Sequence, residues 1–427
     1  MRILEQVKPE AVGLSSERLG RVSNWLHRQV ESERFAGCSA LVGRRGKIAF
    51  FEATGMADKE LGKPFTRDTI TRIYSMTKAV TTVAAMTLYE EGRFQLDDRV
   101  AKFLPEFADT PVWRGGASIL DEVEPQIEPM TIRHLMTHTS GLTYSFMNAN
   151  VVDEAYRENG IEFPGTSGSL EELTRRLATV PLICQPGSEW NYSVSTDVLG
   201  RLLEVWSGQS LNDVLQARVL GPLGMSDTGF HVEPANHDRF AALYAPLSGG
   251  DLSNVARVPS DPDIADRGGL KLQESASESR FLEPPKLYSG GGGLTGTIGD
   301  YARFCQMLLN RGELEGTRLL GRKSVEYMRL NQLPNNRDMA TMGQPVWSET
   351  SYDGIGFGLG FAVVIDPVKA HIVTSPGELH WGGAASTLFW LDPVEDLFTV
   401  FFTQLLPSST YPIRRELRAL VYQALVD

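Results

Sequence analysis

The spacing of apolar residues predicts a helix and a hairpin at the start of the chain. Apolar residues recur at helical intervals over 19–30, and Ser15 or Ser16 stands where such a helix would be capped. Short apolar runs follow at 38–42 and 48–53, joined by a segment that contains two glycines. These runs predict a β-hairpin, on which the first helix would pack its apolar face.

Strand patterns return in the last third of the chain, after four consecutive glycines. They predict a central antiparallel sheet of five or six strands, made with the N-terminal hairpin and covered by the first and last helices. The elements expected after the glycines are a strand over 294–298, a helix through 301–308, strands near 357–365, 370–374, 386–391 and 397–405, and a terminal helix over 411–426.

The middle of the chain reads as helices separated by long irregular loops. Ser169 opens a capping box, a second amphipathic helix over 198–206 ends at Gly208, and a third is expected to begin at Ser210. Residues 246–290 show no periodicity, so we expect them to form a loop that walls a cleft.

These patterns predict an α+β fold with two domains. The two ends of the chain, residues 1–92 and 286–427, would form one discontinuous α/β domain around the sheet. Residues 93–285 would form a mainly helical domain with cleft-lining loops.

Two candidate catalytic residues lie at the start of an apolar helix that ends near Gly92. Ser75 and Lys78 stand three residues apart, so on a helix their side chains share a face and the amine can contact the hydroxyl. Such a pair combines a nucleophile with a base, and the positive end of a helix favours the developing anion. This spacing alone is weak evidence for catalysis, because an ordinary capping serine beside a solvated lysine gives the same pattern.

Tyr192 is a second candidate, just before the second amphipathic helix. A nearby ammonium such as that of Lys78 would stabilise the phenolate and make Tyr192 a base near neutral pH. A tyrosine packed at a helix start is the ordinary alternative.

The segment His380–Ser386, which contains Trp381, Gly382, Gly383 and Ala384, is a third candidate, on or entering a late strand. Paired glycines in a strand indicate a bulge or the close approach of another group to the backbone, and a substrate carbonyl is one such group. A glycine bulge beside a core tryptophan is the ordinary alternative.

Five segments, taken together and in this order, resemble the serine β-lactamase and penicillin-binding protein superfamily. Within it the chain resembles the family VIII carboxylesterases, which are similar to class C β-lactamases. The segments are Ser75–Lys78, Leu135–Leu142, Tyr192–Val194, Gly291–Leu294 and Trp381–Gly383.

The resemblance implies an active site in a cleft between an α/β domain and a helical domain. Ser75 would be the nucleophile, Lys78 its hydrogen-bonded partner, and Tyr192 the base and proton shuttle. Backbone N–H groups of Ser75 and Ala384 would form the oxyanion hole. Trp381, Gly382 and Gly383 would contact the substrate.

Two departures from the wider superfamily point to neutral esters. Val194 stands where many relatives carry an asparagine, and Trp381 opens the segment where they carry Lys-Thr-Gly. We therefore expect a serine carboxylesterase for short- to medium-chain esters, with at most weak β-lactam hydrolysis. A β-lactamase or D-amino peptidase, and a catalytically silent binding or sensor protein, stay open as alternatives.

The composition of the chain disfavours some classes of binding partner. The 427-residue chain has a net charge of -12 and no basic cluster, which disfavours nucleic acid. No apolar run approaches the length of about 20 residues that a membrane helix needs, and the N-terminus lacks a signal-like apolar core, so a cytoplasmic protein is expected. The three cysteines form no C-x-x-C pair and should be free buried thiols.

Metal and cofactor chemistry is not expected. His134 and His138 are four residues apart, but no glutamate follows His134 as in H-E-x-x-H, so a turn after a short helix is the better interpretation. The chain also lacks G-x-S-x-G, which disfavours an α/β-hydrolase. A small-molecule ester is the expected partner, while the oligomeric state and the natural substrate are not predicted.

Overall fold

A large antiparallel sheet joins the two ends of the chain. The computed structural model describes residues 4–115, 122–162, 168–247, 268–343, 352–408 and 410–427. Within these residues the sheet has eight strands, in the order β12-β13-β14-β15-β16-β1-β2-β3. Their bounds are β1 Gly37–Arg44, β2 Lys47–Asp58, β3 Lys63–Pro64, β12 Ile355–Phe357, β13 Ala362–Val364, β14 Leu379–Gly382, β15 Leu388–Asp392 and β16 Leu397–Thr403.

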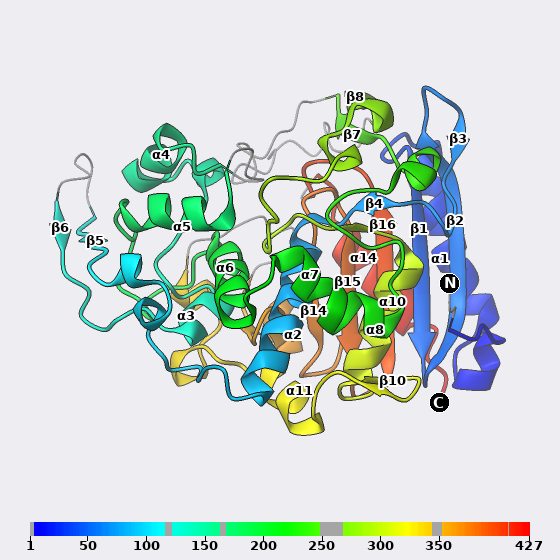
Figure 1. Ribbon diagram of the computed structural model, residues 1–427. Coiled ribbons are helices and arrows are strands. Elements are labelled where there is room, and N and C mark those ends of the chain that lie inside the picture. Colours follow the sequence, from blue (N-terminus) through cyan, green and yellow to red (C-terminus); the bar gives the residue numbers. More distant parts are fainter. Residues whose placement is uncertain (1–3, 116–121, 163–167, 248–267, 344–351, 409) are drawn as a thin grey trace.

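Strand β1 pairs with β16, so the N-terminal hairpin and the late strands meet at the middle of the sheet. Strands β1 and β16 accordingly lie side by side in Figure 1.

Helices cover both faces of the sheet. The amphipathic α1 (Ser16–Glu31) and α14 (Ile413–Tyr422) contact one another, and α1 packs on β1 and β2. On the opposite face, α10 (Ile298–Leu309) packs on β16 and β1. Side chains of β16 alternate between these layers: the Phe401 ring contacts Trp25 of α1, whereas Phe402 contacts Tyr301 of α10.

Most of the remaining helices lie to one side of the sheet (Figure 1). They are α2 Thr77–Glu90, α3 Ile132–Met136, α4 Val151–Glu158, α5 Leu170–Ala178, α6 Ser195–Ser207, α7 Leu211–Leu215 and α8 Gly221–Leu223, with α11 Arg322–Met328, α12 Met339–Met342 and α13 Pro367–Ala370 later in the chain. Two-residue or slightly longer strands connect them: β4 Thr71–Arg72, β5 Val112–Trp113, β6 Val123–Glu124, β7 Leu243–Pro246, β8 Leu270–Glu274, β9 Thr295–Gly296, β10 Glu313–Leu314 and β11 Thr317–Arg318. Helix α2, which follows the Ser75 turn, packs on α6 and α7. No helix in the described part of the chain is both long enough and apolar enough to cross a bilayer.

The predicted starts of α1, α5 and α7 and the predicted end of α6 are confirmed. Local capping signals define these positions. Ser15 caps α1 by accepting a hydrogen bond from the Arg18 amide, and Ser169 forms the predicted capping box of α5. Helix α6 ends at Gly208, whose φ of 72° suits a glycine. Helix α7 begins after its cap Ser210.

The late strands were predicted less well. The stretch 357–365 is the turn-connected pair β12 and β13 rather than one strand. The strand at 370–374 is wrong: Asp366 caps α13 there instead, and the next strand is β14. These shifts, with the short β3, make the described sheet eight strands wide rather than five or six.

The stretch 246–290 was predicted to be irregular. Residues 248–267 of this stretch lie outside the described residues. In the described remainder, β8 is a strand that pairs with β7, so this part is more regular than predicted. The division into two domains at 92 and 286 stays a prediction.

Candidate active site

Ser75 lies in a single 3-10 turn, Tyr74–Met76, that leads directly into α2. Strand β4 enters this turn and is paired with β9. Tyr74 has a φ of 41°, a conformation that non-glycine residues seldom adopt and that is often found at functional sites. The sharp turn places Ser75 in the first helical turn, where backbone N–H groups have no partner within the helix.

The Lys78 amine lies against Ser75, as the spacing predicted. Its Nζ is 3.2 Å from the Ser75 Oγ, 3.0 Å from the Tyr144 hydroxyl and 2.6 Å from the Gly291 carbonyl oxygen. Lys78 is 1% exposed. Burial lowers the pKa of Lys78 to about 7, against an opposing effect of Asp197, so a large fraction of the amine is neutral and able to accept a proton near pH 7.

Tyr192 lies beside this pair, in the loop that precedes α6. The Lys78 Nζ is 4.6 Å from the centroid of its ring. Burial raises the pKa of Tyr192, while hydrogen bonds with Ser75 and Trp381 oppose this shift. The pKa therefore moves opposite to the direction that the expected phenolate requires, because burial disfavours the charged form. In the free protein Tyr192 is a neutral phenol.

Two further residues complete the surroundings of Lys78 and were not predicted. The Tyr144 hydroxyl accepts a hydrogen bond from Lys78, and its ring stacks on Phe146. Asp197, in the first turn of α6, is buried close enough to affect the pKa of Lys78. Tyr144 follows the segment 135–142 that carries part of the resemblance, which was the available signal. An acid in a first helical turn is common, so nothing local singled out Asp197.

The end of β14 comes close to the Ser75 turn. A Cβ atom on Gly383 would lie 2.4 Å from the carbonyl oxygen of Ile73, so this position accepts only glycine. A Cβ on Gly382 would lie 2.7 Å from an Arg414 nitrogen. Protein groups therefore approach both glycines, and contact of this segment with a substrate stays a prediction.

Ala384 directly follows these two glycines in the chain. The Gly383 amide closes a tight turn by donating to the Thr387 carbonyl oxygen at 2.8 Å. Among the described residues the Ala384 amide donates to no backbone carbonyl outside regular elements. The Ala384 N–H therefore has no competing backbone partner of that kind.

The Trp381 side chain is largely buried among other aromatic rings. It is 8% exposed, and its ring centroid lies 5.4 Å from those of Tyr192 and Phe357. A hydrogen bond links it to Tyr192. Trp381 therefore packs against Tyr192 and helps to hold it in place. Val194 is the N-terminal flanking residue of α6 and is also buried.

The histidine pair has other partners. The His134 Nδ1 accepts from the Thr131 amide within the cap of α3, and the His138 Nδ1 lies 3.1 Å from the Ser193 Oγ. Among the described side chains no group of three or more could hold a metal ion. The three cysteines are free and buried, as predicted.

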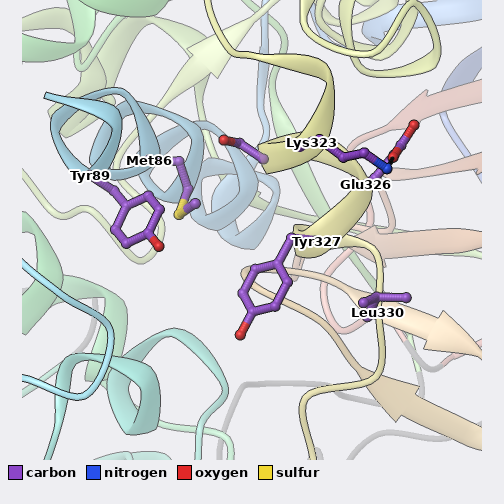
Figure 2. A pocket seen from close by; sticks show the side chains of 7 residues that line it. Met86, Tyr89, Lys323, Glu326, Tyr327 and Leu330 are labelled. Atoms are coloured by element: carbon purple, nitrogen blue, oxygen red, sulfur yellow. Dashed lines mark hydrogen bonds and ion pairs between the residues drawn. The ribbon is translucent and has the colours of Figure 1, made fainter. Parts of the chain in front are cut away.

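A separate surface hollow of about 580 Å³ lies at the other end of α2 (Figure 2). Met86 and Tyr89 of α2 face α11 across it, about 16 Å or more from Ser75 at the helical rise per residue. It contains an exposed ion pair, Lys323 with Glu326. Its described side chains form no serine-lysine hydrogen bond, so the hollow is a poor candidate for the active site but a useful source of control variants. It is lined by Met86, Tyr89, Lys323, Ser324, Glu326, Tyr327 and Leu330.

Comparisons with known proteins cover nearly the whole chain. The profile of the family described as Beta-lactamase matches residues 22–423. Esterase EstB of Burkholderia gladioli is 33% identical over 419 residues, which are 97% of this chain and 98% of EstB. An uncharacterized protein of Mycobacterium tuberculosis (strain CDC 1551 / Oshkosh) is 35% identical over 377 residues, 87% of this chain and 86% of that protein.

Among solved structures, EstCE1 is described as a hydrolase with promiscuous acyltransferase activity. It superposes with a TM-score of 0.76 at 29% identity, and the match covers 95% of this chain and 99% of EstCE1.

Proposed function

The chain belongs to the beta-lactamase family, and we propose that it hydrolyses carboxylic esters through an acyl-enzyme on Ser75. Its α+β fold is the one that the resemblance implied. Its likeness to EstB and EstCE1 identifies a serine carboxylic ester hydrolase. The observation that carries the proposed mechanism is the buried Lys78 amine, 3.2 Å from the Ser75 hydroxyl and with a pKa near 7.

Acylation begins with proton transfer from Ser75 to Lys78. The neutral amine accepts the hydroxyl proton as the Ser75 Oγ bonds to the ester carbonyl carbon, and the carbonyl electron pair moves onto oxygen. The backbone N–H groups of Ser75 and Ala384 stabilise that oxyanion. This step leaves an ammonium on Lys78 and a tetrahedral intermediate on Ser75.

Collapse of the intermediate requires a proton for the leaving alcohol. The neutral Tyr192 hydroxyl donates this proton as the carbon-oxygen bond to the alcohol breaks, and the Lys78 ammonium restores it. In deacylation a water oxygen bonds to the acyl carbon while its proton passes through Tyr192 to Lys78. The Lys78 ammonium then returns a proton to the Ser75 Oγ as the bond from Ser75 to the acyl carbon breaks, which releases the carboxylic acid and free Ser75. In this scheme Lys78 is the base, and Tyr192 relays the proton.

The substrates are neutral esters with short to medium acyl chains. Trp381 stands where a strand lysine would pair with the carboxylate of a β-lactam, and the apolar Val194 replaces an amide. A charge-assisted hydrogen bond is worth about 1.5 to 3 kcal/mol, or one to two decades in rate. Neither a penicillin nor a cephalosporin can therefore gain that binding energy here.

The kcat/KM for p-nitrophenyl butyrate is expected to exceed that for nitrocefin by well over tenfold, because the site lacks both polar contacts to a β-lactam. Steady-state kinetics on one enzyme preparation measure both values, with Ser75→Ala as the control for background hydrolysis. Equal or faster turnover of nitrocefin would favour the β-lactamase alternative instead. No turnover of either substrate, with no labelling by a fluorophosphonate, would favour a silent binding protein.

A further inference from the structure

Asp197 is a buried carboxyl group to which the mechanism above gives no role. It lies in the first turn of α6 and is 2% exposed. Its Oδ1 accepts hydrogen bonds from the Ser289 Oγ at 2.5 Å and from the Gly291 amide at 3.1 Å. A carboxylate so removed from water is costly unless hydrogen bonds and a cation compensate for it.

The second oxygen of Asp197 points toward the partners of Lys78. Among the described residues the Oδ2 has no hydrogen-bond partner. A Cβ atom on Gly291 would lie 2.5 Å from this oxygen and 3.2 Å from the Tyr144 hydroxyl. Both Tyr144 and the Gly291 carbonyl accept hydrogen bonds from Lys78. Asp197 is therefore separated from the amine by a single glycine.

The other groups around Lys78 carry no compensating charge. Burial raises the pKa of Tyr144 and of Tyr192 and lowers that of His138, so all three are neutral near pH 7. Ser75 on the neighbouring turn is uncharged as well. Among the described groups around the Lys78 amine, the Asp197 carboxylate favours the protonated amine and raises its pKa, while burial lowers it.

We propose that Asp197 is a positioning residue for this reaction. Its carboxylate compensates the ammonium that forms on Lys78 when Ser75 loses its proton, and its bond to the Gly291 amide holds the Gly291 carbonyl against the amine. The inference rests on the proposed function, because it takes Lys78 as the base.

Loss of the Asp197 charge should move the pH profile in one direction, whereas a packing defect alone should not move it. The reaction requires neutral Lys78, so kcat/KM should rise as the pH rises through the Lys78 pKa of about 7. Asp197→Asn keeps the shape and an acceptor oxygen for Ser289 and Gly291 but removes the negative charge. The pKa of Lys78 then falls, so the amine stays neutral to lower pH. The ammonium that forms on Lys78 in the transition state is no longer stabilised by a nearby negative charge.

Asp197→Asn is therefore expected to move the acidic limb of the pH profile about 1 to 3 units lower and to lower the plateau. Two rates are measured against pH: kcat/KM for p-nitrophenyl butyrate and the labelling of Ser75 by a fluorophosphonate. Ser289→Ala removes one hydrogen bond to the carboxylate but keeps its charge, so it should move the limb much less than Asp197→Asn does and separates the loss of the hydrogen bond from the loss of the charge. Asp213→Asn, an exposed acid in α7, is the matched control and should leave the profile unchanged.

An unmoved acidic limb in Asp197→Asn, with only the plateau lowered, would overturn the inference and assign Asp197 a purely structural role. A limb displaced to higher pH would also overturn it. If the unmodified protein is not labelled on Ser75 at any pH, the proposed function fails and this inference fails with it. Labelling of Ser75 with identical limbs in all variants overturns the Asp197 inference alone.

Discussion

Ser75→Ala is expected to reduce kcat/KM for p-nitrophenyl butyrate by about a thousandfold or more, to near background. The substitution deletes the atom that becomes acylated. It should leave the fold intact, since it removes a single hydroxyl group whose recorded side-chain partners are Lys78 and Tyr192. Steady-state kinetics and a thermal melt of the same preparation measure the two effects separately.

Ser39→Ala is the matched control for this variant. Ser39 is a fully buried serine of β1, and its Oγ has no hydrogen-bond partner among the described residues, so the control should keep full activity. If Ser75→Ala keeps more than a few per cent of activity in a folded protein, another residue is the nucleophile.

Lys78→Ala and Tyr192→Phe are each expected to lower kcat about 10²- to 10⁴-fold, the usual contribution of a positioned proton-transfer group. The two side chains pass one proton in succession, so losing either one disables the whole relay. The double variant should therefore be scarcely slower than the slower single variant. Kinetics of the four proteins in one double-mutant cycle measure this.

The hollow in Figure 2 supplies the controls for that cycle. Lys323→Ala and Tyr327→Phe make the same chemical changes on α11, at the other end of α2, and should leave kcat unchanged. Losses that multiply in the Lys78→Ala, Tyr192→Phe double variant would mean that the two residues act independently. The proposed relay would then be wrong.

Local sequence rules were sufficient to place the serine and the lysine together. Residues three apart at a helix start share a face whatever the rest of the chain does, and the 3.2 Å contact between Ser75 and Lys78 agrees with this. Capping signals similarly gave the starts of α1, α5 and α7. Tyr192 was found because it precedes a helix with a clear apolar face.

The charge states of the site were not predictable from such rules. A phenolate was expected at Tyr192 because a lysine lay nearby in the proposed site. Burial reverses that expectation by raising the pKa of Tyr192 and lowering that of Lys78 to about 7. Depth of burial depends on how α2, α6 and the glycine-rich segment pack together, which the sequence does not display.

Partners from distant segments were also missed. The glycines at 382 and 383 indicated a close approach to the backbone, and the group that approaches Gly383 is the Ile73 carbonyl, just before the Ser75 turn. Tyr144 and Asp197 reach Lys78 only through tertiary folding. The strand expected at 370–374 failed for a local reason, because Asp366 and Pro367 start a helix there.

Mass spectrometry of a rapidly quenched reaction tests the acyl-enzyme most directly. The protein is mixed with excess p-nitrophenyl butyrate, quenched in acid within the first turnovers and digested, and Ser75→Ala is treated in parallel. The mechanism predicts a mass increase of one butyryl group on the peptide that contains Ser75, located to Ser75 by fragmentation and absent from the variant. A butyryl group found on another residue, and equally abundant in Ser75→Ala, would contradict it.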